Sequence, residues 1–236
     1  MYNMKIILSI TFVLCTLLAC NEKKAVPKAD FVITSGQMPN MAKDNAGRLH
    51  LVYGIGDSIM YTYSSDNGHS FSSPSVVAVL PELFSFATRG PQISATDKGV
   101  VVTACTSIGN IYSYYKENEG WKQGARVNDV DTVAKEGLMA LSADGENAFA
   151  VWLDLRGNKR NKIYGANSND GGRSWSQNIM IYTSPDTTVC ECCKPSVAMQ
   201  GNNVYVMFRN WLNGNRDLYV IQSSNGGTSF AQARRN

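Results

Sequence analysis

Three cysteines stand within four residues of one another, at Cys190, Cys192 and Cys193. Three thiolates at this spacing could hold a soft ion such as Cu(I) or Zn(II). Outside the cytoplasm the same residues could form disulfides, and with Cys105 as a fourth thiol three pairings are open. Reduced, solvent-accessible cysteine is the third alternative. The sequence therefore marks a thiol site and leaves these three chemistries open.

An eight-residue motif, here called the corner phrase, occurs three times with the pattern Ser-x-Asp/Asn-x-Gly-x-Ser-aromatic. It indicates the strands and turns that must position this site. Each copy follows alternating apolar residues, which are typical of a strand. We therefore interpret the phrase as a hairpin corner. Its acid or amide accepts backbone N–H groups, its Gly supplies a positive φ, and its aromatic residue anchors the returning strand. The positions are Ser64, Asp66, Gly68 and Phe71, then Ser168, Asp170, Gly172 and Trp175, then Ser223, Asn225, Gly227 and Phe230.

Strand patterns recur in four units, near residues 38–80, 91–127, 138–183 and 194–236. Asp66 and Asp170 are 104 residues apart, which is two units of 52. The corner due in the second unit, residues 117–121, is a degenerate Glu-Asn-Glu-Gly-Trp. Four-stranded units that repeat every ~50 residues predict an all-β fold, a β-propeller of four blades. A two-sheet sandwich would explain the short strands but not a corner tied to the unit length.

The corner phrase resembles the Asp-box, or BNR repeat, of the sialidase superfamily. That resemblance implies a propeller that is typically six-bladed, in a family of exo-α-sialidases, other glycosidases such as xyloglucanases, and binding propellers of the sortilin type. It therefore implies the fold more strongly than the chemistry. With four units in residues 31–236, we expect a fragment of a six-bladed propeller. The alternative is a closed four-bladed ring in which Phe31–Thr34 supplies a strand to the last blade.

Propeller topology assigns the loops to two rims. The Asp-box corners occupy one, the corner rim, where His69 and Arg173 are expected to be solvated turn residues. The loops between second and third strands share the other, the mouth rim, with the blade connections. Propeller ligands usually bind there, so we expect the site at the mouth rim. Its stretches are residues 81–89, 126–137, 154–160, 184–194 and 210–216.

Sialidase chemistry, which the resemblance implies, uses arginines to clamp a carboxylate, an acid for the leaving group, and a Tyr nucleophile with a Glu. The Arg-Ile-Pro motif that sialidases carry before the first blade is absent, and no Tyr-Glu pair can be assigned from spacing. Surface ion pairs are the alternative role for each candidate. The candidates are Arg89, Arg156 and Arg209 for the clamp, Asp154, Asp129 and Asp131 for the acid, and Glu136 for the base.

Residues 1–20 resemble a bacterial lipoprotein signal. Lys5 precedes an apolar run, Ile6 to Leu18, which is shorter than the roughly 20 residues that a membrane-spanning helix needs. The sequence Leu-Leu-Ala-Cys stands at residues 17–20. We expect a lipid anchor at Cys20, a tether at residues 21–30, and a location in the cell envelope, on the periplasmic or the surface face. An ordinary secretory signal cleaved nearby is the alternative.

The charge pattern argues against nucleic acid as a partner. The formal net charge is +3, the two signs are interspersed, and no Lys/Arg run builds a binding stripe. The first functional hypothesis is an exo-α-sialidase-like hydrolase that acts on terminal sialic acid of glycans and needs no cofactor. The alternatives are a non-catalytic glycan- or protein-binding propeller, or a protein that binds Cu or Zn at its cysteines.

Overall fold

The computed structural model describes residues 32–117, 120–186 and 188–235. The signal segment with Cys20 and the tether lie outside them. The described residues form sixteen strands and no helix, and so contain no helix that could cross a membrane. The strands are β1 (Gln37–Lys43), β2 (Leu49–Ile55), β3 (Ser58–Ser64), β4 (Ser75–Val79), β5 (Gln92–Thr96), β6 (Gly99–Cys105), β7 (Ile111–Glu117), β8 (Gly120–Arg126), β9 (Met139–Asp144), β10 (Asn147–Asp154), β11 (Lys162–Ser168), β12 (Ile179–Tyr182), β13 (Ser196–Gln200), β14 (Asn203–Leu212), β15 (Asn215–Ser223) and β16 (Arg234–Arg235).

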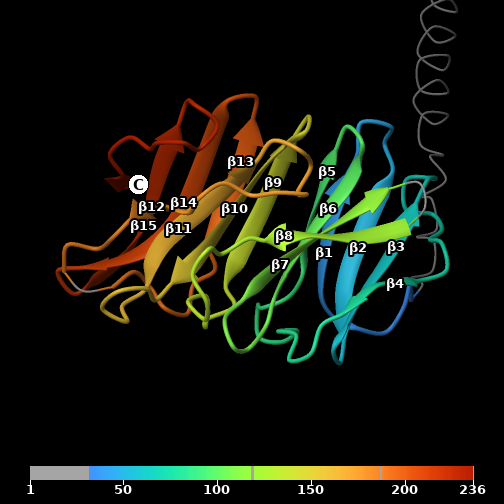
Figure 1. Cartoon of the computed structure of the whole chain (residues 1–236), viewed down its shortest axis with the longest axis horizontal. Coiled ribbons are helices and arrows are strands. Elements are labelled where there is room, and N and C mark those ends of the chain that lie inside the picture. Colours follow the sequence, from blue (N-terminus) through green and yellow to red (C-terminus); the bar gives the residue numbers. More distant parts are fainter. Residues whose placement is uncertain (1–31, 118–119, 187, 236) are drawn as a thin grey trace, which may run out of the picture. The chain divides into compact units, whose positions relative to one another are not determined.

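The strands form four antiparallel sheets, each built from four consecutive strands in chain order. The first strand of each sheet packs against the first strand of the next, β1 on β5, β5 on β9 and β9 on β13. Figure 1 shows the sheets following one another along the chain. This is the blade arrangement of a propeller, which buries its sheet faces only between neighbours. The all-β propeller prediction is confirmed, and the two-sheet sandwich is wrong.

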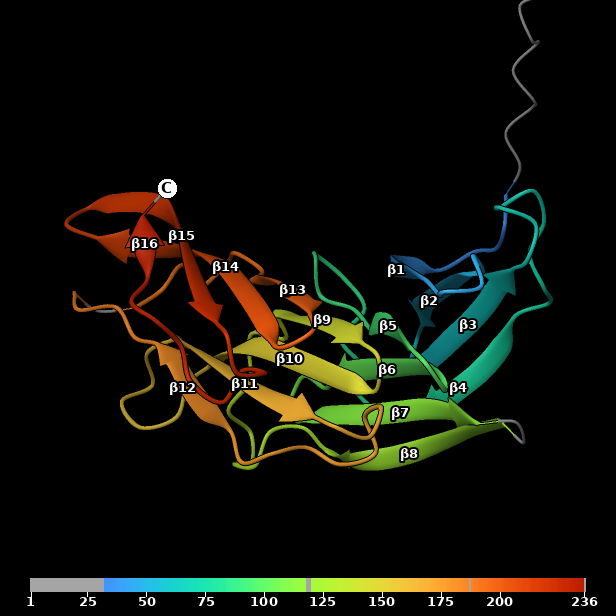
Figure 2. The same ribbon diagram turned by 90° about the horizontal axis from the view of Figure 1, so that it is seen from above.

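The blades form an open arc, with the sheets β1–β4 and β13–β16 at its two ends (Figure 2). The last sheet takes its fourth strand from Arg234–Arg235, which pairs with Tyr219 and Val220. The residues from Val32 to Thr34 belong to no strand, and Phe31 lies outside the described residues. The arc is consistent with a partial propeller, and the closed four-bladed ring is wrong.

Apolar side chains fill the spaces between the blades. Val52 and Ile59 of the first blade share a cluster with Val102 of the second. Phe149 of the third blade shares one with Val206 of the fourth, and each of these five side chains is fully buried. The blades are therefore held mainly by apolar burial, which stabilises by about 25 cal/mol per Å².

Each Asp-box corner is closed by its own acid or amide. Asp170 Oδ1 accepts the backbone N–H groups of Arg173 and Ser174 at 3.0 and 2.9 Å, and Oδ2 accepts the Ser174 hydroxyl at 2.5 Å. Ser168 Oγ accepts the N–H of Gly172 at 2.9 Å. Asp66 holds Ser70 in the same way. The side chain thus partners N–H groups that a tight turn would leave open.

The third corner shows that the negative charge is dispensable. Asn225 Oδ1 accepts the N–H of Ser229 at 3.0 Å, as the aspartates do for their serines. Its Nδ2 donates to Ser229 Oγ at 2.8 Å, which reverses the direction of the side-chain bond. The corner therefore needs an acceptor for the backbone and a hydrogen-bonding partner for the serine, and an amide provides both.

The corners of the third and fourth blades also join each of these blades to the one before it. Gly172 has φ +85° and lies so close to Val101 of the second blade that a Cβ would not fit, and its carbonyl accepts the Ser113 hydroxyl at 2.6 Å. Arg173 lies over the Tyr115 ring at 4.6 Å and 3.3 Å from Glu117 Oε1. The prediction that Arg173 is merely solvated is therefore wrong, because it binds the second blade, whereas His69 is exposed as expected.

We predict that Asp170→Ala lowers the free energy of unfolding by about 2 kcal/mol, because it leaves several donors of the corner without a partner. Asp170→Asn, which copies Asn225, should cost less than about 1 kcal/mol. Burial raises the pKa of Asp170, but hydrogen bonds from Ser174 outweigh it and the pKa is lowered. Its stabilisation is therefore present above the unfolded pKa of about 3.9 and lost as pH falls below it. Urea unfolding from pH 7 to 3 measures both effects, and equal losses in the two variants would contradict the assignment.

Candidate functional site

The mouth rim is assembled from blade connections that are hydrogen-bonded to the loops inside the blades. Ser107 N–H donates to the Glu82 carbonyl at 2.9 Å, and Leu155 N–H donates to the Val133 carbonyl at 2.9 Å. Cys190 N–H donates to the carbonyl of Arg209 at 2.9 Å. Each connection is thereby fixed to a strand end, so that side chains from distant stretches of the sequence share one rim.

Arg156 and Asp154 form a closed network on this rim. Asp154 is fully buried, and its carboxylate accepts hydrogen bonds from Trp152 Nε1 and from Nε and Nη2 of Arg156, all at 2.9 Å. Arg156 Nη1 binds Asp129 at 2.9 Å, and the guanidinium lies 4.1 Å from the centre of the Tyr164 ring. Burial lowers the pKa of Arg156, but the two carboxylates outweigh it and the pKa is raised.

Every nitrogen of the Arg156 guanidinium thus has an internal partner. A substrate carboxylate would have to displace Asp154 or Asp129 from it. Asp154, with no exposed surface, has no access to a leaving group. In this arrangement both residues join a loop of the third blade to the connection before it, and we assign them a structural role.

Arg89 and Glu136 also meet, as an ion pair between two successive blade connections. Arg89 Nε donates to the Glu136 carbonyl at 2.5 Å, and Nη2 lies 3.4 Å from Glu136 Oε2. The guanidinium lies about 6 Å from the ring centres of Phe84 and Phe86. Arg89 therefore anchors the segment that carries both rings.

That segment contains a strained turn. Phe86 and Arg89 are bridged as a strand pair, and the two residues between them, Ala87 and Thr88, have φ of 46° and 71°. Positive φ at both central positions is the geometry of a type I′ turn, which Asn and Gly adopt far more easily. Each residue in such a strained conformation costs about 1–3 kcal/mol of folding free energy. The conformation persists where contacts with neighbouring residues hold it. Here it presents the Phe86 ring with 54% of the residue exposed.

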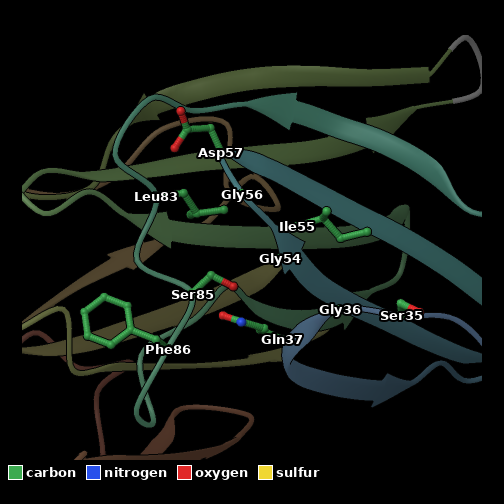
Figure 3. A pocket seen from close by; sticks show the side chains of 10 residues that line it. All are labelled: Ser35, Gly36, Gln37, Gly54, Ile55, Gly56, Asp57, Leu83, Ser85 and Phe86. Carbon is green, nitrogen blue, oxygen red and sulfur yellow. The ribbon is translucent and has the colours of Figure 1, made fainter.

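A hollow of about 570 Å³ lies beside this turn, between the ends of β1 and β2 and the connection to β5. Figure 3 shows the polar side chains of Ser85 and Gln37 between Phe86 on one side and Ile55 on the other. Ser85 is 7% exposed, and its hydroxyl has no hydrogen-bond partner among the described residues. Buried hydroxyls are rarely left this way, so the site offers an unused donor and acceptor. The hollow is lined by Ser35, Gly36, Gln37, Gly54, Ile55, Gly56, Asp57, Leu83, Ser85 and Phe86.

The cysteine cluster lies at the other end of the mouth rim, on the connection that enters β13. Cys190 Sγ is 3.0 Å from Cys193 Sγ and 3.6 Å from Cys192 Sγ, and the three sulfurs lie within 4.8 Å of one another. All are free thiols. Arg209 Nη1 lies 3.9 Å from Cys193 Sγ. Three converging sulfurs of graded exposure, beside a cation, are a donor set that suits a soft metal ion.

The thiols of the cluster differ in acidity. Burial raises the pKa of Cys190 to about 11. Burial also acts to raise that of Cys193, but hydrogen bonds with Cys190 and Arg209 outweigh it and the pKa is lowered. Of these two thiols, Cys193 therefore loses its proton at lower pH. Cys105 takes no part in the cluster, because it is buried against the carbonyls of Thr106 and Ala134 and its pKa is raised to about 12.

The mouth rim therefore brings the candidate residues together in separate groups. Arg89 meets Glu136, Arg156 meets Asp154 and Asp129, and Arg209 lies beside Cys193. Arg126 and Asp131 form a further pair. Among the described residues no hydrogen bond or ion pair joins any two of the three clamp arginines.

Sequence reasoning included residues 81–89 in the mouth but did not single out Ser85, Phe86, Gln37 or Asp57. The signal that could have found them is the run Leu-Phe-Ser-Phe at residues 83–86. Two aromatic rings in a loop between propeller blades have to pack somewhere or face a ligand. The orphaned Ser85 hydroxyl, in contrast, depends on neighbours distant in the sequence and could not be foreseen.

No protein-family model and no curated protein matches the chain in sequence. Several solved structures resemble it in fold. An ulvan lyase of polysaccharide lyase family PL25 matches with a TM-score of 0.55 and 13% identity, over 85% of this chain and 55% of that one. The Aleuria aurantia lectin, in complex with Fucα1-6GlcNAc, matches with 0.57 and 15%, over 84% and 60%. An α-L-arabinofuranosidase from Clostridium thermocellum matches with 0.50 and 14%, over 86% and 74%.

The chain thus spans less than two thirds of the lyase and of the lectin. At 13–15% identity these likenesses bear on the fold alone. They define the chain as a β-propeller of the kind that also occurs in glycan-active proteins.

We predict that Arg156→Ala lowers the free energy of unfolding by about 3 kcal/mol, because it leaves the buried Asp154 carboxylate uncompensated. Arg209→Ala is the matched control, since that side chain is exposed and should cost less than about 0.5 kcal/mol. Chemical unfolding at pH 7 compares the two variants. An Arg156→Ala protein of unchanged stability would contradict the structural role of Arg156.

Proposed function

We propose that the protein is a glycan-binding propeller that holds a sugar in the mouth-rim hollow of its first blade. The observation that carries the proposal is the hollow itself, with the exposed Phe86 ring beside the buried, unpartnered Ser85 hydroxyl. Gln37 and Asp57 add an amide and a carboxylate to its lining.

These groups match the chemistry of a sugar ring. A pyranose has a face of C–H groups that packs on an aromatic ring and an edge of hydroxyls that both donate and accept hydrogen bonds. An exposed aromatic ring offers apolar area at low entropy cost, and a few placed polar groups fix the orientation of the ligand. The strained turn keeps Phe86 in position before the ligand arrives, which lowers the cost of binding.

The fold neighbours support a glycan as the ligand class. They include a lyase named for ulvan, a lectin in complex with fucosylated GlcNAc, and an arabinofuranosidase. Binding is favoured over cleavage at this site, because the lining of the hollow contains a single carboxylate, Asp57, whereas glycoside hydrolysis generally uses two carboxyl groups. The proposal also includes export and a lipid anchor at Cys20, which would place the hollow at the cell envelope.

We predict that Phe86→Ala weakens glycan binding about tenfold, which corresponds to 1.4 kcal/mol. Tyr205→Ala is the matched control, because Tyr205 is 43% exposed on the last blade. Binding is measured on immobilised neutral, uronate-containing and sialic-acid-terminated oligosaccharides, and circular dichroism verifies that both variants are folded. If the folded protein binds none of these sugars, or if both variants lose binding equally, the proposal is wrong.

A more specific form of this proposal is that the protein has exo-α-sialidase activity. The Asp-box repeat favours it, while the internal partners of Arg89 and Arg156 require that the mouth rearrange before the arginines can clamp a carboxylate. A fluorogenic sialoside tests it directly. Turnover by the wild-type protein, lost in Arg209→Ala with the fold intact, would establish hydrolysis, and no turnover would leave glycan binding alone.

The cysteine cluster favours a second candidate function, the binding of Cu(I). Three sulfurs within 4.8 Å of one another can ligate one ion, and three sulfur donors suit Cu(I), whereas Zn(II) takes four ligands and would need another donor. The guanidinium of Arg209 would offset part of the negative charge of such a thiolate complex.

We predict that the reduced protein retains one equivalent of Cu(I) against a competing chelator under anaerobic conditions. Cys193→Ser should lose this binding, whereas Cys105→Ser should keep it, because Cys105 lies outside the cluster. Elemental analysis after desalting gives the stoichiometry, and Zn(II) is tested in parallel. A substoichiometric metal content, or equal retention by both variants, would remove the metal from the proposed function.

A further inference from the structure

A second hollow, of about 530 Å³, lies on the corner rim between the first and second blades. The turn between β1 and β2 and the side chains of His50, Tyr61 and Tyr63 form one wall. The turn between β5 and β6, with Lys116 and Glu117 at the end of β7, forms the other. This hollow faces away from the mouth rim and is independent of the glycan site proposed there.

The hollow has a structural cause in the degenerate corner of the second blade. At the next interface the Asp-box of the third blade covers the second, through Gly172 on Val101 and Arg173 over Tyr115. At the last interface Gly227 and Phe230 cover Phe149 of the third blade. The second blade has no Asp-box, and its Trp121 packs edge-on against Tyr61, with the ring centres 5.1 Å apart. Space that a corner covers elsewhere is left open beside that contact.

The wall on the first blade contains a buried hydrogen-bond chain. His50 is 5% exposed, and its Nε2 lies 3.2 Å from Asp44 Oδ2 while its Nδ1 lies 2.7 Å from the Tyr61 hydroxyl. Asp44 accepts, so Nε2 carries the proton, and Tyr61 then donates to Nδ1. Burial lowers the pKa of His50, so the ring is neutral at pH 7 and the chain is fully satisfied. The wall is therefore preformed and rigid.

Two cations of the lining, Arg48 on this wall and Lys116 on the other, have unused hydrogen-bond donors. Arg48 uses its Nε on Asp44 at 2.8 Å, and its two terminal amino groups have no partner among the described residues. Lys116 has no ion pair there, and its nearest aromatic neighbour is Trp121, with Nζ 6.0 Å from the ring centre. Both cations act on His50 strongly enough to lower its pKa further.

Two of the three acids of the lining, Asp44 and Glu117, are engaged in ion pairs. Glu117 binds Lys122 at 2.7 Å and Arg173 at 3.3 Å, outside the hollow. Asp44 is taken by Arg48 and His50, and Asp97 accepts the Asn45 amide at 3.2 Å. The remaining lysine of the lining, Lys98, is paired with Glu146 at 3.1 Å. Among the described residues, the cationic donors of the lining that remain unused are therefore those of Arg48 and Lys116, and Asp97 is the one acid of the lining that has no cation partner.

We propose that this interblade hollow is a second carbohydrate site, specific for a sugar that carries an anionic group, a carboxylate or a sulfate. Arg48 and Lys116 bind the anion from opposite walls, because a guanidinium and an ammonium donate charge-assisted hydrogen bonds to its oxygens. The partly exposed ring of Tyr63 packs against the sugar, and backbone and hydroxyl groups at Thr96–Val100 meet its other hydroxyls. A neutral sugar would leave both cations without a partner, so the site rejects it.

Calorimetric titration of the full chain with three tetrasaccharides tests the proposal. The probes are tetragalacturonate, a sulfated carrageenan tetrasaccharide and neutral cellotetraose. We expect an anionic probe to bind, with an affinity that falls as salt rises, and cellotetraose to bind at least tenfold more weakly at this site. Whichever anionic probe binds identifies the carboxylate or the sulfate as the group recognised.

Matched variants separate this site from general charge and from the mouth rim. Lys116→Ala should weaken binding of the anionic probe about tenfold, and Lys116→Arg should largely retain it. Lys135→Ala removes an equal charge from the mouth rim, where that side chain is exposed, and Phe86→Ala alters the mouth-rim site, so neither should change it. Urea unfolding confirms that Lys116→Ala is folded. The proposal is overturned if neither anionic probe binds, if cellotetraose binds equally well, or if Lys135→Ala weakens binding as much as Lys116→Ala.

Discussion

The propeller depends on the way a short side chain satisfies the backbone of a tight corner. Asp66, Asp170 and Asn225 each accept N–H groups of the residues that follow, and in the third and fourth blades a glycine in the left-handed region lets the corner approach the preceding blade. Without that acceptor the corner would lose the hydrogen bonds that close it, and without the glycine it could not come near enough. Blade spacing, rim assignment and the location of the corner-rim hollow follow from this geometry.

The charged residues of the two rims differ in whether they have partners within the protein. On the mouth rim, Arg156 and Asp154 pair with each other, and the exposed Phe86 ring lies beside the buried Ser85 hydroxyl, which has no partner among the described residues. On the corner rim, at the interface where the corner motif is degenerate, Arg48 and Lys116 keep unused donors. A charged side chain that lacks a partner within the protein therefore indicates a binding site better than the mere presence of a charged side chain does.

The fold could be predicted from the sequence because its determinants are local. The spacing of Asp66 and Asp170, the alternating apolar residues before each corner and the glycines depend only on neighbours along the chain. The candidate site was harder to predict from the sequence, because its contacts form between residues of different blades and connections. Arg156 looked like a clamp residue in the sequence, yet its donors are taken by Asp154, two residues away, and by Asp129 and Asn178, which are 27 and 22 residues away. The hydrogen-bond chain around His50 could not be predicted either, because strand pairing brings Tyr61 and Asp44 to its ring.

The direction of the corner contacts gives the molecule a polarity along its chain. Gly172 of the third blade completes the second, and Phe230 of the fourth completes the third, whereas Gly68 of the first corner meets only Leu49 of its own blade. Each blade thus receives its final packing from the blade made after it. During synthesis, a blade that has left the ribosome would remain incompletely covered until the next corner follows, so consolidation of the domain lags one blade behind translation.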